Sequence, residues 1–251
     1  RSPEFWLAAA IFFLSFFGYS LPRWFEDSPL EYKDSALQLS LGGIYFGGIQ
    51  LILYFCASLI GAIRQVDETR GSVMRWRVLR LGTKRYIFRK LLCQALAGAL
   101  AAAGAFLLHA AIWNIIALPP DPIKYPMHYN FFWEESIYYS WYTIAHGLPI
   151  YLSTALGLAL NGAGIAWLSI AVAVWLPDKL IAVVMPALLI SAYSAGFFRE
   201  IFGVYVPFFS DLYNDGLTVN ALWQALAALF VMMAISAMVY SFGVERKVRH
   251  A

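Results

Sequence analysis

The sequence predicts an all-α integral membrane protein with six transmembrane helices and a short surface helix between the second and the third. Hydrophobic residues make up 61% of the 251-residue chain and charged residues only 13%, about half the share that is typical of a soluble domain. The apolar residues gather in runs long enough to cross a bilayer, without the alternation expected of a membrane β-barrel. Nine of the eighteen Lys and Arg residues lie between Arg64 and Lys90.

A single transmembrane domain, residues 1–251, accounts for the whole chain. Each apolar run is expected to form a helix, because a lone strand would leave its backbone N–H and C=O groups without partners in lipid. The six predicted spans cover residues of about 5–21, 37–63, 91–118, 149–176, 180–198 and 218–243.

The fourth and fifth spans are separated by three residues only, Pro177, Asp178 and Lys179. A tight turn at the inner membrane surface is one interpretation, and a single kinked helix is the other. The single helix would move the basic segment 246–249 to the outside. Because Lys and Arg collect in cytoplasmic segments, the tight turn and six helices are favoured.

Charge is segregated between two sets of connecting segments. The proposed outer segments, 22–36, 119–136 and 199–217, hold ten acids and four bases, whereas the remaining segments hold fourteen bases and five acids. The Lys/Arg bias of short loops therefore predicts that the segment 64–90 and both termini lie in the cytoplasm. The net charge of +3 is small and gives no indication of nucleic-acid binding.

Polar residues are sparse within the predicted spans. His109 is the sole side chain there that could carry charge near neutral pH, which disfavours ion-coupled transport. Gln50, Asn114 and Asn161 are candidate substrate-path residues, although such side chains more often hydrogen-bond to neighbouring helices. Small residues are dense in 42–48, 95–105 and 157–166, a pattern that indicates close helix packing or a sliding or dimerising face.

The basic segment contains a predicted amphipathic helix. Apolar residues alternate with Arg75, Arg77 and Arg80, so this helix could lie flat at the membrane surface. Asp67 and Glu68 are expected at its start, where a helix favours acids, and Gly82 is expected at its end. One interpretation is purely structural: the helix lies at the membrane surface, and its bases follow from the positive-inside rule. The alternative is that the helix docks into another protein.

These residues resemble the coupling region of the permease subunits of ATP-binding-cassette exporters of the type-2 class, also called type V. In that family an acid and a Gly open a surface helix after the second span, and a Lys begins the third. Glu68, Gly71 and Lys90 occupy these places here, although the acid-to-Gly spacing is short and Leu81–Thr83 replaces the usual Ser/Thr-Pro turn. Six spans, inner termini and an outer segment, 197–214, similar to the family's short re-entrant helices before the last span, extend the resemblance.

The resemblance implies a permease that exports a hydrophobic or amphipathic substrate from a bacterial cell membrane. It favours a peptide such as a bacteriocin or lantibiotic over drugs and lipid-linked glycans. The chain has no GxxxxGK[ST] motif, so it is not expected to be an enzyme. ATP and Mg would bind a separate ATPase, present in two copies, and this chain is expected to hold no cofactor of its own. A second permease copy, identical or related, and membrane lipids complete the expected partners. The residues expected to couple the ATPase are Glu68, Arg70, Gly71, Met74, Arg75, Trp76 and Leu79.

Two other functions are alternatives to an exporter. A non-transporting membrane anchor or sensor could recruit a cytoplasmic protein through the same basic segment. An intramembrane metalloprotease would need an acid pair and a nearby metal, but Glu134 and Glu135 are followed by Tyr139 where an EExxxR motif has Arg. His109, His128 and His146 lack the close spacing typical of zinc ligands, so no metal site is predicted.

Overall fold

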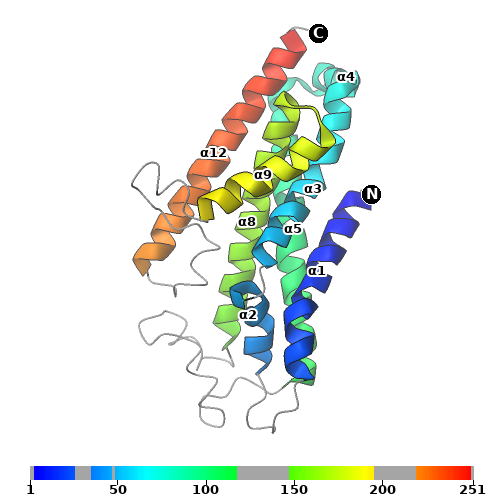
Figure 1. The fold of residues 1–251 in the computed structure, drawn as a ribbon. Coiled ribbons are helices and arrows are strands. Elements are labelled where there is room, and N and C mark those ends of the chain that lie inside the picture. Colours follow the sequence, from blue (N-terminus) through cyan, green and yellow to red (C-terminus); the bar gives the residue numbers. More distant parts are fainter. Residues whose placement is uncertain (1–2, 26–34, 47–48, 118–146, 195–218, 250–251) are drawn as a thin grey trace.

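The computed structural model describes residues 3–25, 35–46, 49–117, 147–194 and 219–249 (Figure 1). Every element in this part of the chain is a helix, as the composition predicts. The predicted outer features, namely Glu134, Glu135, His128, His146 and the segment 197–214, lie outside the described residues. The helices are α1 (Pro3–Trp24), α2 (Ala36–Phe46), α3 (Ile49–Arg70), α4 (Val73–Leu81), α5 (Thr83–Ile116), α8 (Leu148–Trp175), α9 (Lys179–Ser194) and α12 (Val219–Arg249).

Five of the described helices, α1, α3, α5, α8 and α12, are long and apolar enough to cross a membrane. This indicates a multi-pass membrane protein. α9 is also apolar but shorter, with 16 residues. At 1.5 Å per residue it is about 24 Å long, less than the roughly 30 Å of a bilayer core. The predicted fifth span runs on to residue 198, and residues 195–198 lie outside the described part.

The predicted second span, 37–63, corresponds to two helices in the structure. α2 and α3 lie on either side of residues 47–48, which are not described, and α3 continues to Arg70. α5 starts at Thr83, well before the predicted third span. The segment 64–90 is therefore almost entirely helical. Hydropathy marks where a helix leaves the apolar layer, whereas the helix itself continues through charged residues.

The chain breaks between α8 and α9 at the Pro-bearing turn. Oδ1 of Asp178 accepts hydrogen bonds from the backbone N–H groups of residues 180–181, at 2.9 and 3.1 Å, and so caps α9. Two ion pairs join this turn to the end of α3: Arg70 with Asp178 at 3.6 Å, and Lys179 with Asp67 at 2.8 Å. The fourth and fifth apolar runs are thus two separate helices.

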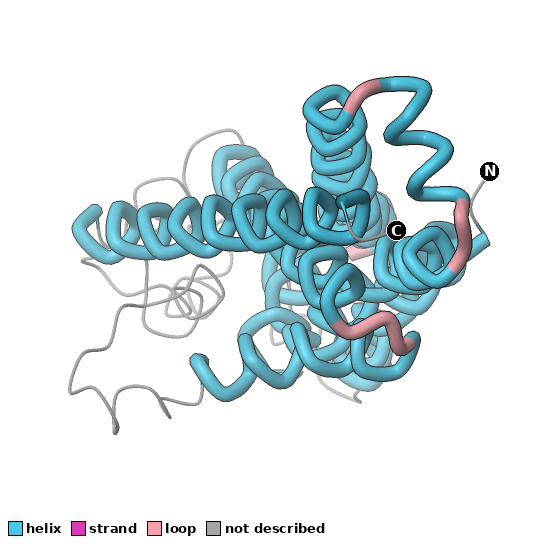
Figure 2. The backbone as a smooth tube through the Cα atoms, turned by 90° about the horizontal axis from the view of Figure 1, so that it is seen from above, coloured by secondary structure: helices cyan, strands magenta, loops and turns pink. Residues whose placement is uncertain are grey.

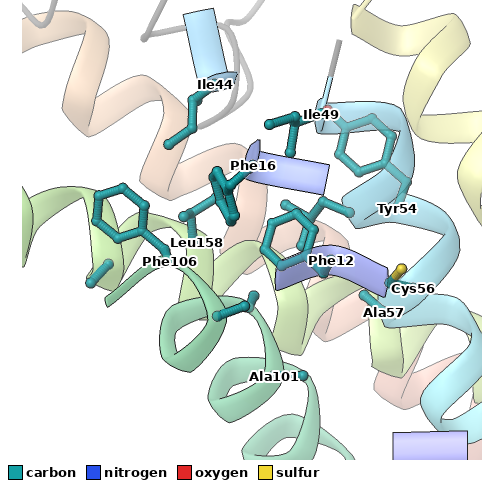
Figure 3. Close-up of a cluster of buried hydrophobic side chains, with 14 of the residues drawn as sticks. Phe12, Phe16, Ile44, Ile49, Tyr54, Cys56, Ala57, Ala101, Phe106 and Leu158 are labelled. Carbon is teal, nitrogen blue, oxygen red and sulfur yellow. The ribbon is translucent and has the colours of Figure 1, made fainter. Parts of the chain in front are cut away.

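The largest apolar core joins most of the helices (Figure 3). Phe12 and Phe16 of α1 are buried at its centre, in contact with the side chains that α3, α5 and α8 contribute. Their rings lie 4.9 Å apart in an edge-to-face arrangement, which aromatic pairs prefer. α8 is the most buried of the five long apolar helices and contacts α3, α5, α9 and α12.

Two small-residue segments, 95–105 and 157–166, bring α5 and α8 into close contact. A Cβ atom at Gly98 would lie 2.3 Å from the carbonyl oxygen of Gly162, and one at Gly162 would lie 2.4 Å from that of Gly98. No side chain larger than hydrogen fits either position at this separation. These segments therefore serve as a tight packing contact within the chain.

Candidate functional site

One end of the bundle carries most of the chain's positive charge. It is formed by α4, the starts of α5 and α9, and the C-terminal ends of α3, α8 and α12 (Figures 1 and 2). The acids in these elements are Asp67, Glu68, Asp178 and Glu245. We call this region the basic end. Its thirteen bases are Arg64, Arg70, Arg75, Arg77, Arg80, Lys84, Arg85, Arg89, Lys90, Lys179, Arg246, Lys247 and Arg249.

α4 lies at the edge of the basic end and bridges the ends of α3 and α5 (Figure 2). Met74 and Val78 are one helical turn apart and both are buried, in a cluster with Tyr86 of α5 and Tyr240 of α12. The helix ends at Gly82, whose φ of 77° favours glycine and whose N–H donates to the carbonyl of Val78 at 2.8 Å. Its inner face therefore holds α4 against the bundle.

The opposite face of α4 is exposed and apolar as well as basic. Trp76 and Leu79 are 63% and 67% exposed, and Arg75 and Arg80 are also exposed. Large exposed apolar side chains on a short helix with basic neighbours are unusual on a surface that contacts only water. This outer face, defined by Arg75, Trp76, Leu79 and Arg80, is the candidate docking surface.

A buried carboxylate fastens α4 to its two neighbours. Oε2 of Glu68 accepts hydrogen bonds from Nζ of Lys90 at 3.0 Å and from the hydroxyl of Tyr86 at 3.1 Å. Oε1 accepts from Nη1 of Arg77 at 2.5 Å and lies 3.3 Å from Nε of Arg64. The Glu68 side chain is 5% exposed. A carboxylate so buried requires this full set of partners, and together they join α3, α4 and α5.

A second set of contacts connects α12 to this cluster. The hydroxyl of Tyr240 donates to Oε1 of the buried Gln65 at 3.4 Å. Nε2 of Gln65 donates to Thr69 at 3.1 Å and lies 4.0 Å from the sulfur of Met74. α8 also bonds to α12, because Nε1 of Trp175 donates to the carbonyl of Val239 at 3.0 Å. These contacts join α4 to α3, α5 and α12, so α4 could move only if these three helices moved with it or the contacts broke.

The acids before α4 were expected at its start, and this expectation is wrong. Asp67 and Glu68 lie in the last turns of α3, and the residue at the N-terminus of α4 is Ser72. The reason is that α3 continues past its apolar part as far as Arg70, which positions Glu68 to face inward.

The seven residues predicted to couple an ATPase divide between the surface and the interior. The buried ones hold α4 in place and cannot themselves form the contact surface. Arg75, Trp76 and Leu79 are exposed on α4, Gly71 is exposed in the turn before it, Glu68 and Met74 are buried, and Arg70 is exposed but bonded to Pro177 and Asp178.

Arg64, Arg77, Tyr86 and Gln65 were not selected from the sequence, although they complete the cluster around Glu68. The four-residue spacing of Arg64 and Glu68 is the one local signal that indicates part of it. The other partners come from different helices, so pairing them requires the fold.

In the described part of the chain, the three candidate substrate-path residues lie on three different helices, α3, α5 and α8. The amide nitrogen of Asn161 donates to Gly157 at 3.1 Å in the interior, and that of the exposed Asn114 donates to Ala110 at 2.8 Å. Gln50 is half-buried near the start of α3. A largely apolar cavity of about 670 Å³ lies elsewhere, between α8, α9 and α12, where Gln224 and Ser236 contribute polar atoms.

His109 is buried in a cluster that joins α1 to α5. Its Nε2 lies 2.8 Å from Nε1 of Trp113 and 3.1 Å from Oγ of Ser20, and its ring stacks on that of Phe16. An indole N–H only donates, so Nε2 accepts and the imidazole is neutral. Within the described residues no group of three or more His, Cys, Asp or Glu side chains is arranged to hold a metal ion.

Comparisons of this chain with protein-family models, with curated proteins and with solved structures found no match, so the resemblance to exporter permeases stays a prediction.

Proposed function

We propose that the chain is the permease subunit of an ATP-driven exporter of the ATP-binding-cassette type, and that a separate ATPase docks on α4. The observation that carries the proposal is the two-sided character of α4. Trp76 and Leu79 project outward, while Met74 and Val78 anchor the opposite face to the bundle. A docking element that must transmit force needs both a contact surface and a firm attachment.

The outer face of α4 has the composition of a protein contact. Trp and Arg are the residue types that most often dominate binding energy when they are buried at an interface. Trp76 and Leu79 would fill an apolar cleft of the ATPase, and Arg75 and Arg80 would favour acidic residues at its rim. Closure of an ATPase dimer on ATP and Mg would then push α4.

The attachment of α4 indicates how such a push would reach the membrane. Glu68 joins the helix to α3 and α5, and Gln65 bonds to Tyr240 of α12. Displacement of α4 would change the packing of α12 against α8 and α9, where the 670 Å³ cavity lies. Its apolar lining suits a hydrophobic or amphipathic substrate, and a peptide of the bacteriocin or lantibiotic kind is the class we favour.

The proposed assembly contains two permeases and two ATPase subunits in a bacterial cell membrane. The basic end would face the cytoplasm because Lys and Arg collect on that side. Both termini would then be cytoplasmic, and the six-span topology would be completed by the apolar run that begins in α9.

Mild-detergent purification of the chain from its native membrane, followed by mass spectrometry, tests the proposal. We expect an ATP-binding-cassette ATPase at a ratio close to one per permease, together with ATP hydrolysis in the purified complex. Recovery of a different cytoplasmic protein at that ratio, without ATP hydrolysis, would instead support a membrane anchor or sensor.

A further inference from the structure

A second pocket at the basic end has a chemistry that ATPase docking does not use. It has a volume of about 380 Å³ and lies between α3, α4 and α5. Four bases and one acid line it. The negative charge of Glu68 offsets one of the four positive charges, so the pocket has a net positive charge. The charged residues are Arg64, Arg77, Arg89, Lys90 and Glu68.

The positive charges of this pocket exceed the negative charge that the described residues supply to it. Arg64, Arg77 and Lys90 converge on Glu68, which can neutralise only one of their three charges. Arg89 forms no ion pair with any acid in the described part of the chain. Guanidinium groups match the geometry of phosphate oxygens, so the excess charge suits a phosphate group.

The pocket opens where the apolar surface of α5 begins. Arg89 and Cys93 lie on the same face of α5 as Leu96 and Leu100, at intervals of three and four residues, and all four are exposed. The charged end of this stripe belongs to the basic end, and the remainder lies within the apolar part of α5. A ligand with a phosphate at one end and hydrocarbon at the other would match it along its whole length.

We infer that the pocket between α3, α4 and α5 binds the phosphate headgroup of an anionic glycerophospholipid, for which phosphatidylglycerol is the probe. Its phosphate lies among Arg64, Arg89 and Lys90, and its acyl chains lie along Leu96 and Leu100. Basic pockets between transmembrane helices near the membrane surface bind anionic headgroups in this way. The inference does not depend on what docks on α4.

The exposed thiol of Cys93 in the pocket wall provides the measurement. The full chain in neutral detergent is treated with N-ethylmaleimide, and the modification is followed by intact mass. Buried Cys56 serves as the internal control for folding, because it reacts only when the bundle opens. We expect phosphatidylglycerol to slow modification of Cys93 at a concentration at least tenfold lower than phosphatidylcholine requires.

Variants separate a headgroup site from general charge attraction. A base that contacts the headgroup phosphate is expected to contribute about as much as a base at an anionic membrane surface, about fivefold in affinity. Arg89→Gln should therefore raise the half-protecting concentration about fivefold, and the double change Arg64→Gln/Arg89→Gln about twenty-fivefold. Lys247→Gln removes a base from the same end but outside the pocket and should change nothing. Arg89→Gln alone decides the matter if Cys56 becomes reactive in the double variant.

Three results would overturn the inference. Equal protection by phosphatidylcholine would indicate ordinary lipid contact without headgroup recognition. Equal protection by inorganic phosphate would indicate a site for a free anion. Equal loss of protection in Lys247→Gln and Arg89→Gln would indicate attraction to the whole basic end.

Discussion

The ammonium group of Lys90 lies 3.0 Å from Oε2 of Glu68, although the two residues are 22 positions apart and belong to different helices. Both side chains are almost fully buried at the end of the bundle that is richest in bases. Arg77 of α4 bonds to the other carboxylate oxygen. Glu68 therefore links α3, α4 and α5 directly.

Glu68→Gln should lower the stability of the fold more than Asp67→Asn, the same kind of change at the neighbouring residue. The substitution removes the counter-charge of Arg64, Arg77 and Lys90, and breaking a buried pair in this manner costs about 3 kcal/mol. Asp67→Asn is the matched control, since Asp67 and its partner Lys179 are each about half exposed and such pairs contribute about 1 kcal/mol or less. The stability of both variants is measured by heating the protein in detergent and monitoring unfolding as the reaction of Cys56 with N-ethylmaleimide. Equal shifts in the two variants would contradict the role assigned to Glu68.

Gly98→Ala should separate α5 from α8. The added methyl would overlap the carbonyl of Gly162, and overpacking of this kind costs about 1–3 kcal/mol. Gly104→Ala is the control on the same helix, because a Cβ there meets nothing within 4 Å. The control should be neutral or slightly stabilising, by up to about 1 kcal/mol from helix propensity. The same thermal assay compares them, and an unaltered Gly98→Ala variant would show that the close approach is not required.

His109→Leu should destabilise the contact between α1 and α5. The indole N–H of Trp113 would lose its acceptor, and a buried donor without a partner costs about 1–3 kcal/mol. Asn114→Leu is the comparison, since within the described residues its exposed amide bonds only to the carbonyl of Ala110 in its own helix. Its stability should change by no more than about 0.5 kcal/mol. A stable His109→Leu chain with lost transport would instead assign His109 a role in export.

The sequence predicts which segments form long helices better than it predicts where α3 ends and α5 begins. Apolar runs identify the long helices, and Pro177 with Asp178 marks the break between α8 and α9 because these residues start a helix and do not continue one. The extension of α3 to Arg70 and the early start of α5 were missed, since charged residues end an apolar run without ending a helix.

The candidate site shows the same division. The outward position of Trp76 and Leu79 follows from the amphipathic pattern of residues 73–81, which the structure bears out as a helix. The inward position of Glu68 depends on Tyr86 and Lys90, which reach it from the next long helix. No local pattern specifies such contacts, because they arise only when α3 and α5 are packed together.

The most direct test of the central claim is the amount of ATPase that remains bound when the outer face of α4 is altered. In Trp76→Glu/Leu79→Glu the buried face of α4 and the Glu68 cluster are unchanged, so insertion and folding should persist while co-purified ATPase falls at least tenfold. Phe88→Glu is the control, a 66% exposed apolar residue of α5 near the same end that lies outside the docking surface. It should retain the ATPase. Full ATPase recovery with the double variant, or equal loss with Phe88→Glu, would contradict docking on α4.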